Sequence, residues 1–470
     1  MQLLRRPRHV HACVSCRSHG SCCSASSGVV SGSPFGPSFF DLPSSPLWLW
    51  CAVAVAVTAV RGRQAAQQQL TDDRTNCKLQ ERRPALLRRR AQSRSRADSD
   101  TRARLNAPLV AIVLVLIVTS PAVTSMTSRA AIAQLRSTSS KRANLLSVAR
   151  CTGWAKREGA SMLFLPECLG FMGDSARHTL ASADPPIDTL LRRDVPTEAD
   201  SEVRKMLADA IEGCSREGGN CDGPAGGAAG SHRQADQPVE SIIRELQFVA
   251  SRAKLWISGG GVHTRTTDSE KIHNTHVIID SDGRIRAHYH KIHLFDVSIP
   301  GKVALRESNT TDPGGELVVV DSPLGRLGLG ICYDMRFPEM YVELVRRGAE
   351  VLLAPSAFTV PTGRAHWHAL LRARAIEGQC YMIAAAQVGR HNERRRSYGH
   401  SVAYDPWGEL LADAGGYDSP GVEACEEEGE EDSPIKAPSV IVVDIVPGRV
   451  AEVRERMPIQ DHRERATFPR

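Results

Sequence analysis

The run Leu327-Gly328-Leu329-Gly330-Ile331-Cys332-Tyr333-Asp334-Met335-Arg336 decides how the C-terminal half of the chain is organised. It opens with a mostly apolar stretch of strand length, and polar residues begin at Cys332. Glu339–Arg347 then has helical spacing of its apolar residues and ends before Gly348, a residue type that is common after helices. Val351–Ala354 is the next apolar run. A strand, a helix and a second strand in this order predict an α/β fold, in which helices cover the faces of a sheet.

The same alternation of strands and helices continues on both sides of this segment. Short apolar runs bounded by turn residues predict strands, and longer runs with apolar residues on one face predict helices. The turn Asp405-Pro406-Trp407-Gly408 is expected to join two short strands as a hairpin. The predicted strands are Ala130–Leu135, Met162–Leu165, Leu255–Ser258, Arg284–His290, Val318–Val320, Tyr381–Ala386, Val402–Tyr404, Glu409–Leu411 and Val440–Ile445, and the further predicted helices are Asn144–Glu158, Ile242–Lys254 and His366–Ile376.

Charge divides the chain into two unlike parts. The formal net charge is +6, and residues 1–107 hold 17 Lys and Arg against 6 Asp and Glu, so this part carries +11 and the rest carries −5. A basic field confined to a terminal tail argues against a nucleic-acid-binding face on the folded part. The 13 cysteines form no repeated CxxC pairs, and their odd number argues against a disulfide framework and for a reducing compartment.

Residues 1–126 do not have the pattern of a globular domain. They are basic and rich in Ser and Arg, and their apolar runs Leu47–Val60 and Leu109–Val118 are shorter than the ~20 residues that span a bilayer. The stretch is therefore expected to be disordered. Three interpretations stay open: an organellar targeting presequence, a dispensable extension of a protein that begins at Met126, and a membrane anchor. The expected location is the cytoplasm or an organelle such as the mitochondrion, and a membrane contact is not expected.

Residues 127–470 are long enough to build one large core. The interval of about 177–239 is polar and Gly-rich, which predicts an insertion that runs over the surface. The acidic run Glu426–Asp432 predicts a solvated loop. The expected organisation is therefore a basic extension over 1–126, followed by a single domain with one insertion.

Three ionisable residues directly follow predicted strands, and they are Glu167, Lys291 and Cys332. Sites in α/β folds lie at such strand ends, and a charge buried there requires a partner. A carboxylate next to a thiol provides a base that takes its proton, and an ammonium favours the thiolate that results. The thiolate attacks a carbonyl or nitrile carbon, while the ammonium and the backbone N–H of Tyr333 stabilise the oxyanion. The trio predicts a cysteine hydrolase in which Glu167 moves the protons.

The strings around these residues resemble the three signature segments of the nitrilase superfamily of C–N hydrolases. They are Leu163–Glu167, His290–Asp296 and Gly330–Glu339, and they occur in the order that the superfamily has. Lys291 and Cys332 are 41 positions apart, a spacing that resembles that of the small amidases. This resemblance implies a four-layer α/β/β/α sandwich that forms a homodimer or a larger homo-oligomer. It also implies a small-molecule amide as substrate, with no metal and no organic cofactor.

The resemblance assigns a role to each residue that matches a signature segment. It implies Cys332 as the nucleophile and Glu167 as the general base. It implies Lys291 as the oxyanion stabiliser and Glu307 as a supporting carboxylate that orients this lysine. One departure is His290, because relatives usually have an arginine at that position.

Downstream segments resemble the branch that contains deaminated glutathione amidase and ω-amidase. Gly389–Glu393 and Ser397–Ser401 favour the former, which implies cleavage of the side-chain-type amide of a 2-oxo acid to 2-oxoglutarate and Cys-Gly, a metabolite-repair reaction. Lys291–Asp296 favours ω-amidase, which acts on 2-oxoglutaramate. The remaining alternative is a non-catalytic interaction protein with the same fold, against which the intact Glu, Lys and Cys argue.

A substrate of this kind carries a carboxylate, which a guanidinium recognises through paired hydrogen bonds. Arg336 is the candidate, and Phe358 and Thr362 line the same pocket by resemblance. The structural alternative for Arg336 is an ion pair with Glu339 or Asp334.

A second basic element is the run Arg394–Arg396. We expect it to be a solvated loop, and its alternative role is contact with an anionic part of the substrate.

Overall fold

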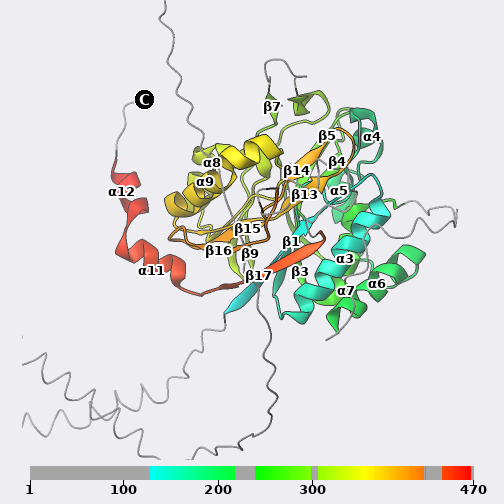
Figure 1. Ribbon diagram of the computed structural model, residues 1–470, viewed down its shortest axis with the longest axis horizontal. Coiled ribbons are helices and arrows are strands. Elements are labelled where there is room, and N and C mark those ends of the chain that lie inside the picture. The colour runs from blue at the N-terminus through cyan, green and yellow to red at the C-terminus, as the bar shows by residue number, and fades with distance from the viewer. Residues whose placement is uncertain (1–126, 217–238, 298–304, 418, 420–436, 467–470) are drawn as a thin grey trace, which may run out of the picture. The chain divides into compact units, whose positions relative to one another are not determined.

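Figure 1 shows the computed structural model of the chain, which describes residues 127–216, 239–297, 305–417, 419 and 437–466. The predicted extension over 1–126, the Gly-rich end of the predicted insertion and the acidic run 426–432 lie outside the described residues. Within the described ranges, no helix combines the length and the apolar character that crossing a membrane requires.

The larger of two sheets has nine strands and is built around β1 (Ser128–Leu135). This strand pairs in parallel with β2 (Met162–Phe164) and β13 (Ala386–Arg390), and β2 pairs in parallel with β3 (Trp256–Ser258). The short strand β2 is apolar and fully buried, as expected where both faces of a sheet are covered. The remaining strands pair in antiparallel fashion and are β4 (Val262–Arg265), β5 (Ile272–Ile279), β6 (Ile285–His290), β14 (Arg396–Tyr398) and β17 (Ser439–Ile445).

The smaller main sheet has six strands, with β10 (Gly325–Gly328), β11 (Val351–Leu353) and β12 (Tyr381–Ala384) parallel at its centre. Ala385 separates β12 from β13, so the chain passes from one sheet to the other within the run that the sequence predicts as a single strand. The other strands are β9 (Val319–Ser322), β15 (Val402–Tyr404) and β16 (Leu410–Asp413), and a separate two-stranded ribbon consists of β7 (Asp296–Val297) and β8 (Leu305–Arg306).

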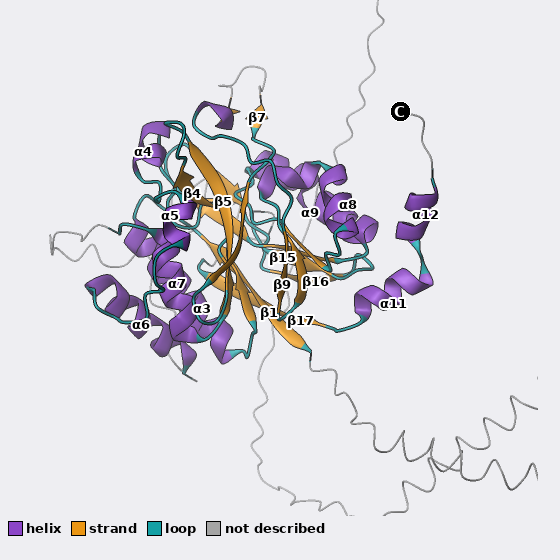
Figure 2. Cartoon of the chain, turned by 180° about the vertical axis from the view of Figure 1, so that it is seen from behind, coloured by secondary structure: helices purple, strands orange, loops and turns teal. Residues whose placement is uncertain are grey.

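Helices cover the outer faces of the two sheets, as Figure 2 shows from behind. Because side chains alternate along a strand, Ala131 and Ala133 of β1 pack in the core with the helices, while Ala130 and Ile132 pack in the core between the sheets. The four layers confirm the predicted α/β/β/α sandwich. The helices are α3 (Lys141–Arg157) and α7 (Ile242–Ala253) on the larger sheet, and α8 (Pro338–Arg346) and α9 (Val360–Gly378) on the smaller one.

The first part of the predicted insertion is folded, which the low hydrophobicity of the interval did not indicate. It forms α4 (Ala176–Ala181), α5 (Ile187–Leu191) and α6 (Glu202–Ser215). Leu207 and Ile211 of α6 are buried in the same core as α3 and α7. The helix α6 is thus part of the helical layer, and the expected excursion over the surface is wrong for it.

Buried Asp184, in the same interval, holds the N-terminus of α7. Its carboxylate accepts hydrogen bonds from the hydroxyl of Ser241 at 2.7 Å and from the backbone N–H groups of Ile242 and Ile243 at 2.9 Å each. A negative charge at a helix N-terminus satisfies unpaired N–H groups and complements the helix dipole. The interval therefore fixes the helix that leads into β3.

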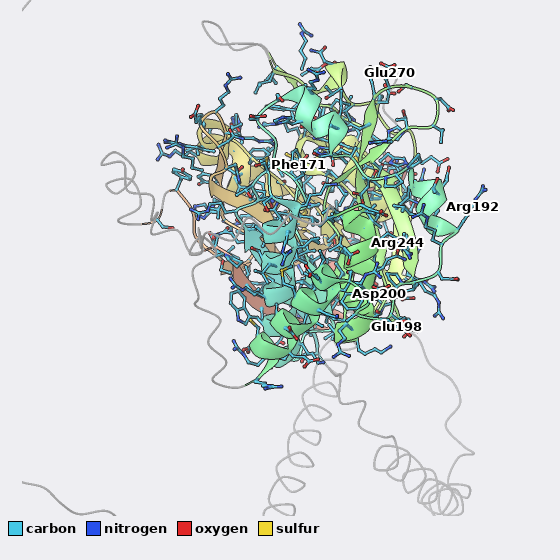
Figure 3. All side chains as sticks on the ribbon, turned by 90° about the vertical axis from the view of Figure 1, so that its right-hand side faces the viewer. Phe171, Arg192, Glu198, Asp200, Arg244 and Glu270 are labelled. Carbon is cyan, nitrogen blue, oxygen red and sulfur yellow. The ribbon has the colours of Figure 1, made fainter. Side chains whose placement is uncertain are left out.

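A surface ion-pair network adds a second link between α6 and α7. Arg204 of α6 pairs with Asp200 at 2.8 Å and with Glu245 of α7 at 3.1 Å. Figure 3 views this side of the molecule and labels Asp200. The sequence did not predict two further helices near the C-terminus, α11 (Arg449–Arg456) and α12 (Ile459–Arg465).

Candidate active site

The ammonium of Lys291, the residue after β6, lies at the centre of the candidate site. Its Nζ is 3.1 Å from Oε1 of Glu167 and 3.0 Å from Oε2 of Glu307, and its side chain is 2% exposed. Burial alone would lower the pKa of Lys291, but the negative charges of the two carboxylates raise it well above its ordinary value. Glu307 also accepts a hydrogen bond from the backbone N–H of Phe295 at 2.7 Å. Glu307 therefore holds the lysine in place, as the resemblance implies.

Glu167, which follows β2 after Pro166, is buried and ionised. Its Oε1 accepts from the side-chain amide of Asn274 at 2.8 Å, and its Oε2 accepts from the backbone N–H of Ala357 at 2.9 Å. Burial would raise the pKa of this carboxyl, but the positive charges of Lys291 and Arg395 outweigh it, so the pKa is lowered. A carboxylate that stays ionised at neutral pH is a suitable acceptor for a thiol proton.

A glycine turn after β3 allows Glu167 and Asn274 to approach each other. A Cβ atom at Gly261 would collide with Oδ1 of Asn274 and lie 3.0 Å from Cγ of Glu167. Gly260 has a positive φ of 44°, where a side chain is strained. Sequence reasoning missed Asn274 because the residue lies in the middle of β5, where nothing local marks it.

Cys332 is the first residue of a short 3-10 helix, Cys332–Arg336, and its backbone has a positive φ of 47°. A non-glycine residue in this region costs about 1–3 kcal/mol, and such strain often marks functional sites. The carboxylate of Glu167 lies beside the thiol. Burial, followed by the charge of Glu167, raises the pKa of Cys332 well above its ordinary value. The raised pKa favours the protonated thiol at rest, and Glu167 is placed to take its proton during attack.

Tyr333 supplies the candidate backbone donor for an oxyanion. Its N–H lies in the first turn of the 3-10 helix, where no carbonyl of the helix can accept from it. None of the hydrogen bonds among the described residues uses this N–H group. Its ring packs edge-on against Phe295 and Phe337, at centroid distances of 5.1 and 5.5 Å. The donor is thus available and held in place.

Asp334 connects the loop of Lys291 to the loop of Cys332. Its carboxylate is fully buried and accepts from the backbone N–H of Ile331 at 2.9 Å, the hydroxyl of Tyr289 at 2.8 Å, and the backbone N–H of His293 at 3.0 Å. The ring Nδ1 of His293 lies 2.8 Å away as well. Because these donors flank both Lys291 and Cys332 in the chain, Asp334 fixes the two reactive residues relative to each other.

Replacing Asp334 with asparagine is expected to lower the free energy of unfolding by about 2–4 kcal/mol, because the amide nitrogen cannot accept the bonds that a carboxylate oxygen accepts. Chemical denaturation measures this change. Asp321→Asn is the matched control, since the Asp321 side chain is 91% exposed and pairs with Arg326 at the surface. Its expected effect is below about 0.5 kcal/mol. Equal losses in the two variants would contradict the role of Asp334.

Arg336 and Phe358 meet beside the nucleophile, whereas the hydroxyl of Thr362 is engaged elsewhere. The guanidinium of Arg336 lies 5.2 Å from the ring of Phe358 and hydrogen-bonds to His366 at 3.3 Å. No carboxylate of the described residues pairs with Arg336, so the alternative of an ion pair with Glu339 or Asp334 is wrong. Thr362 donates to the backbone of Thr359 at 3.2 Å, in the first turn of α9.

Arg395 is a further cation at the site, although the sequence predicts a solvated loop there. It lies in the β13–β14 connection, where its N–H donates to Oδ1 of Asn392 at 2.9 Å. Arg395 is exposed to solvent, yet its positive charge helps to lower the pKa of Glu167. Packing around its guanidinium would lower the pKa of Arg395, but the negative charges of nearby groups, among them Glu167 and Glu307, raise it. A residue that is open to solvent and also close to these groups lies at the mouth of the site.

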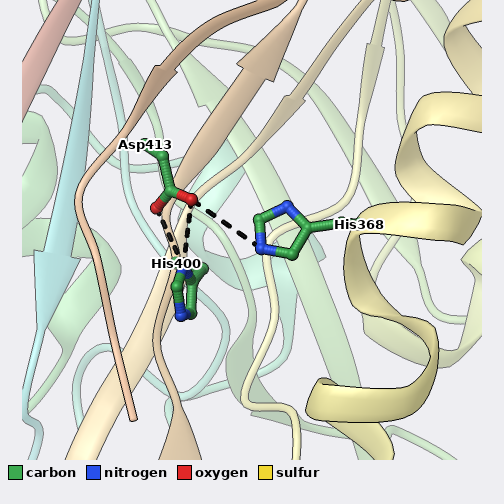
Figure 4. A group of neighbouring side chains, drawn as sticks. All are labelled: His368, His400 and Asp413. Carbon is green, nitrogen blue, oxygen red and sulfur yellow. Dashed lines mark hydrogen bonds and ion pairs between the residues drawn. The ribbon is translucent and has the colours of Figure 1, made fainter. Parts of the chain in front are cut away.

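The described residues offer two places for a cation. At the catalytic cluster the ammonium of Lys291 already occupies the position between the carboxylates. The other place is a group of His368, His400 and Asp413, which takes no part in the hydrogen bonds of the catalytic cluster (Figure 4).

A buried thiol, carboxylate and ammonium at the strand ends of a four-layer α/β/β/α sandwich define a thiol hydrolase of carbon–nitrogen bonds. The family model described as carbon-nitrogen hydrolase matches residues 224–455. The chain is also 40% identical to mouse deaminated glutathione amidase over 286 residues. This aligned region covers 60% of this chain and 72% of the mouse protein. The chain therefore belongs to the carbon-nitrogen hydrolase family, as the resemblance of its signature segments predicts.

Further relatives agree with this membership. Deaminated glutathione amidase of Dictyostelium discoideum is 45% identical over 225 residues, which is 47% of this chain and 71% of that protein. The crystal structure of the Caenorhabditis elegans NitFhit protein superimposes with a TM-score of 0.53 at 34% identity, over 73% of this chain and 66% of that one. The chain covers a smaller share, 39%, of the curated sequence of NitFhit, a nitrilase and fragile histidine triad fusion.

Proposed function

We propose that the chain hydrolyses deaminated glutathione to 2-oxoglutarate and Cys-Gly through an acyl-enzyme on Cys332. The observation that carries the proposal is the buried cluster of Glu167, Lys291 and Cys332, with Lys291 bound to Glu167 at 3.1 Å. The substrate is supported by the names of the mouse and Dictyostelium relatives, which are 40% and 45% identical to the chain.

Acylation begins with the neutral thiol beside the ionised Glu167. The sulfur of Cys332 attacks the amide carbon while Glu167 accepts the thiol proton. The carbonyl oxygen becomes an oxyanion, which Lys291 and the N–H of Tyr333 stabilise. When the C–N bond breaks, Glu167 gives its proton to the departing nitrogen, and the amine Cys-Gly leaves. A thioester between the 2-oxoglutaryl group and Cys332 remains.

Deacylation repeats the same proton movements with water. Glu167 takes a proton from a water molecule while the oxygen of that water attacks the thioester carbon. Lys291 again stabilises the oxyanion. The C–S bond then breaks, the thiolate of Cys332 recovers the proton from Glu167, and 2-oxoglutarate leaves. One water is consumed, and the enzyme returns to its resting state.

The two arginines near the site match the charges of this substrate. Deaminated glutathione carries a carboxylate on its 2-oxo acid end and another on its glycine end. Arg336 has no carboxylate partner among the described residues, and Arg395 has none either. Since a paired guanidinium–carboxylate contact is strong and directional, we propose that Arg336 binds the 2-oxo acid end and that Arg395 lies towards the other end.

Arg336→Gln is expected to raise KM for deaminated glutathione by about 10–100-fold with a smaller change in kcat, because a charged hydrogen bond contributes about 1.5–3 kcal/mol. Steady-state kinetics with deaminated glutathione and with 2-oxoglutaramate measures the effect. Arg192→Gln, at the exposed surface in Figure 3, is the matched control and should leave KM unchanged. An unchanged KM in Arg336→Gln would remove this residue from the substrate pocket.

The same assay tests the substrate itself. A higher kcat/KM for deaminated glutathione than for 2-oxoglutaramate is the expected result for the wild-type chain. A preference for 2-oxoglutaramate would make it an ω-amidase, and no hydrolysis of either compound would return the chain to the non-catalytic alternative.

We also propose that the chain forms a homodimer. Support comes from the outer edge of the six-stranded sheet, where β16 exposes Leu410 and Leu411. Trp407 and Ile376 are exposed nearby, and Gly408 packs on Ile376. Contiguous exposed apolar side chains of this kind are typical of protein–protein interfaces. The molecular mass in sedimentation equilibrium distinguishes a dimer from a monomer.

A reducing compartment is proposed as the location, either the cytoplasm or an organelle. The five cysteines among the described residues are all free and buried, which supports a reducing environment. N-terminal sequencing of the native protein, together with fractionation of the cells that make it, distinguishes an imported and processed chain from a cytoplasmic one.

A further inference from the structure

Three metal-binding side chains from separate segments meet beside the smaller sheet. His368 comes from α9, His400 follows β14, and Asp413 ends β16. One ligand atom from each residue lies within 4.8 Å of the others, and Figure 4 shows the two imidazoles on either side of the carboxylate. We propose that His368, His400 and Asp413 bind a divalent transition-metal ion, with Zn²⁺ as the best match, at a site separate from the catalytic cluster.

The separations fit ligands of one ion. Nδ1 of His400 lies 3.0 Å from both carboxylate oxygens of Asp413, and Nε2 of His368 lies 3.7 Å from Oδ2 of the same residue. Two ligand atoms bound to Zn²⁺ at about 2.0–2.1 Å in tetrahedral geometry are about 3.3 Å apart. The two histidine nitrogens lie within 4.8 Å of each other, so side-chain rotations that bring them closer place all three atoms at bonding distance.

In His368 and in Asp413, one polar atom of the side chain already has a hydrogen-bond partner outside the cluster. The other polar atom is therefore left to face the proposed ion. Nδ1 of His368 is hydrogen-bonded to the hydroxyl of Tyr404 at 2.9 Å, so Nε2 faces the cluster. Oδ1 of Asp413 accepts from the backbone N–H of Gly415 at 2.8 Å, so Oδ2 remains for the ion. Outer hydrogen bonds of this kind orient metal ligands in known sites.

His400 is held by packing instead of by an outer hydrogen bond. Its backbone has a positive φ of 59°, and its ring stacks on Tyr398 with centroids 4.6 Å apart. Nε2 is buried without a hydrogen-bond partner and lies against Gly416. The fold thus turns Nδ1 of His400 towards Asp413. It does so with a strained backbone conformation at His400.

The donor set selects the kind of ion. Two imidazole nitrogens and one carboxylate suit Zn²⁺ and neighbouring transition metals, whereas Ca²⁺ and Mg²⁺ prefer oxygen ligands. Exposure rises from 9% for the side chain of His400 to 22% for Asp413 and 38% for His368. The site therefore opens to solvent beside His368, where water completes the coordination of the ion. Imidazole nitrogens and carboxylates bind a metal ion in their deprotonated forms, so affinity should fall as the pH is lowered.

The ion would join three parts of the fold, namely α9, the segment after β14 and the end of β16. Binding to the folded state alone stabilises a protein in proportion to the logarithm of the ion concentration. The direct readouts are therefore ion binding and thermal stability, and neither depends on catalytic activity.

The test uses the full chain, freed of metal with a chelator that is then removed. Zn²⁺ and Co²⁺ are titrated separately by calorimetry into the wild type, His368→Gln, Asp413→Asn and His178→Gln. His178 is the matched control, because it forms an exposed pair with Asp174 and belongs to no three-ligand group of the described residues. We expect His368→Gln and Asp413→Asn to lose one bound ion or to bind it at least about 10-fold more weakly than the wild type. His178→Gln should behave like the wild type.

Cysteines elsewhere in the chain can also bind Zn²⁺ or Co²⁺. The readout is therefore the difference in bound ions and in affinity between each variant and the wild type. The Co²⁺ bound at the proposed site should show ligand-field bands of nitrogen and oxygen ligands, without thiolate charge transfer, and these bands should disappear in His368→Gln. Saturating Zn²⁺ should raise Tm of the wild type more than that of either variant. Equal ion numbers and affinities in all four proteins would overturn the proposal and leave a hydrogen-bonded His–Asp pair.

Discussion

Cys332→Ala is expected to lower kcat at least about 10⁴-fold for every amide that the chain hydrolyses, because no other group can form the acyl-enzyme. The fold should survive, since alanine keeps the Cβ atom of Cys332 and removes only the sulfur. Steady-state kinetics and mass spectrometry of enzyme quenched during turnover measure the two consequences. The wild type should carry a mass increase equal to the acyl group, and Cys332→Ala should carry none.

Cys151→Ala is the matched control for this loss. Cys151 is also a free and buried cysteine, but it lies in α3, on the helical side of the larger sheet. Its replacement should cost some stability through the cavity that it leaves, while kcat stays within a factor of about 2. If Cys332→Ala kept the turnover of the wild type, the covalent mechanism would be wrong.

Lys291→Met is expected to reduce kcat by about 10³-fold or more, for two separate reasons. The oxyanion loses a charged donor, and loss of one such donor alone costs about 10²–10³-fold. Two carboxylates, the buried Glu167 and the partly buried Glu307, then face each other without the ammonium between them, so one of them takes up a proton. A protonated Glu167 cannot accept the proton of the Cys332 thiol. Kinetics over a range of pH separates the two effects.

The pH dependence of kcat/KM tests the second reason, the protonation of Glu167. In the wild type the pKa of Glu167 is lowered, so kcat/KM should fall on the acid side only below the usual range of a glutamate. In Lys291→Met burial remains and the larger of the two positive charges that act on Glu167 is gone, so the pKa of Glu167 should rise and the acid limb should move to higher pH. Lys254→Met, at an exposed ion pair with Asp282, is the control and should leave the profile unchanged. An unmoved acid limb in Lys291→Met would show that Glu167 is not the base.

Periodicity predicted most of the sandwich, because its central strands and helices have complete apolar patterns. It did not predict that the run Tyr381–Ala386 belongs to two sheets. The chain changes sheets at Ala385, and the signal for this is tertiary, since Ser401 accepts from the backbone N–H of Ala386 at 2.8 Å. It also missed the first turn of α9, which starts at Val360 with a proline in its first turn, a position where proline is tolerated.

The reactive residues were predictable because each lies within four positions of the end of a strand, and the groups that support them were not. Asn274 reaches Glu167 across 107 residues of sequence, and Tyr289 reaches Asp334 across 45. Neither partner has a local pattern that marks it, because the hydrogen bond exists only after the sheet has formed. Arg395 is a similar case, since a run of three arginines in a loop does not indicate which one turns towards the site.

The ion cluster of Lys291 with Glu167 and Glu307 has a consequence for the energetics of turnover. Together the three groups carry one negative charge, and the thiol beside them is neutral. In the proposed mechanism, attack moves a proton onto Glu167 and creates an oxyanion, so the total is still one negative charge, and the later steps preserve it. The interior therefore solvates the same net charge throughout the cycle, and only its position changes by a few ångströms. Ionic strength should accordingly affect substrate capture far more than the chemical steps.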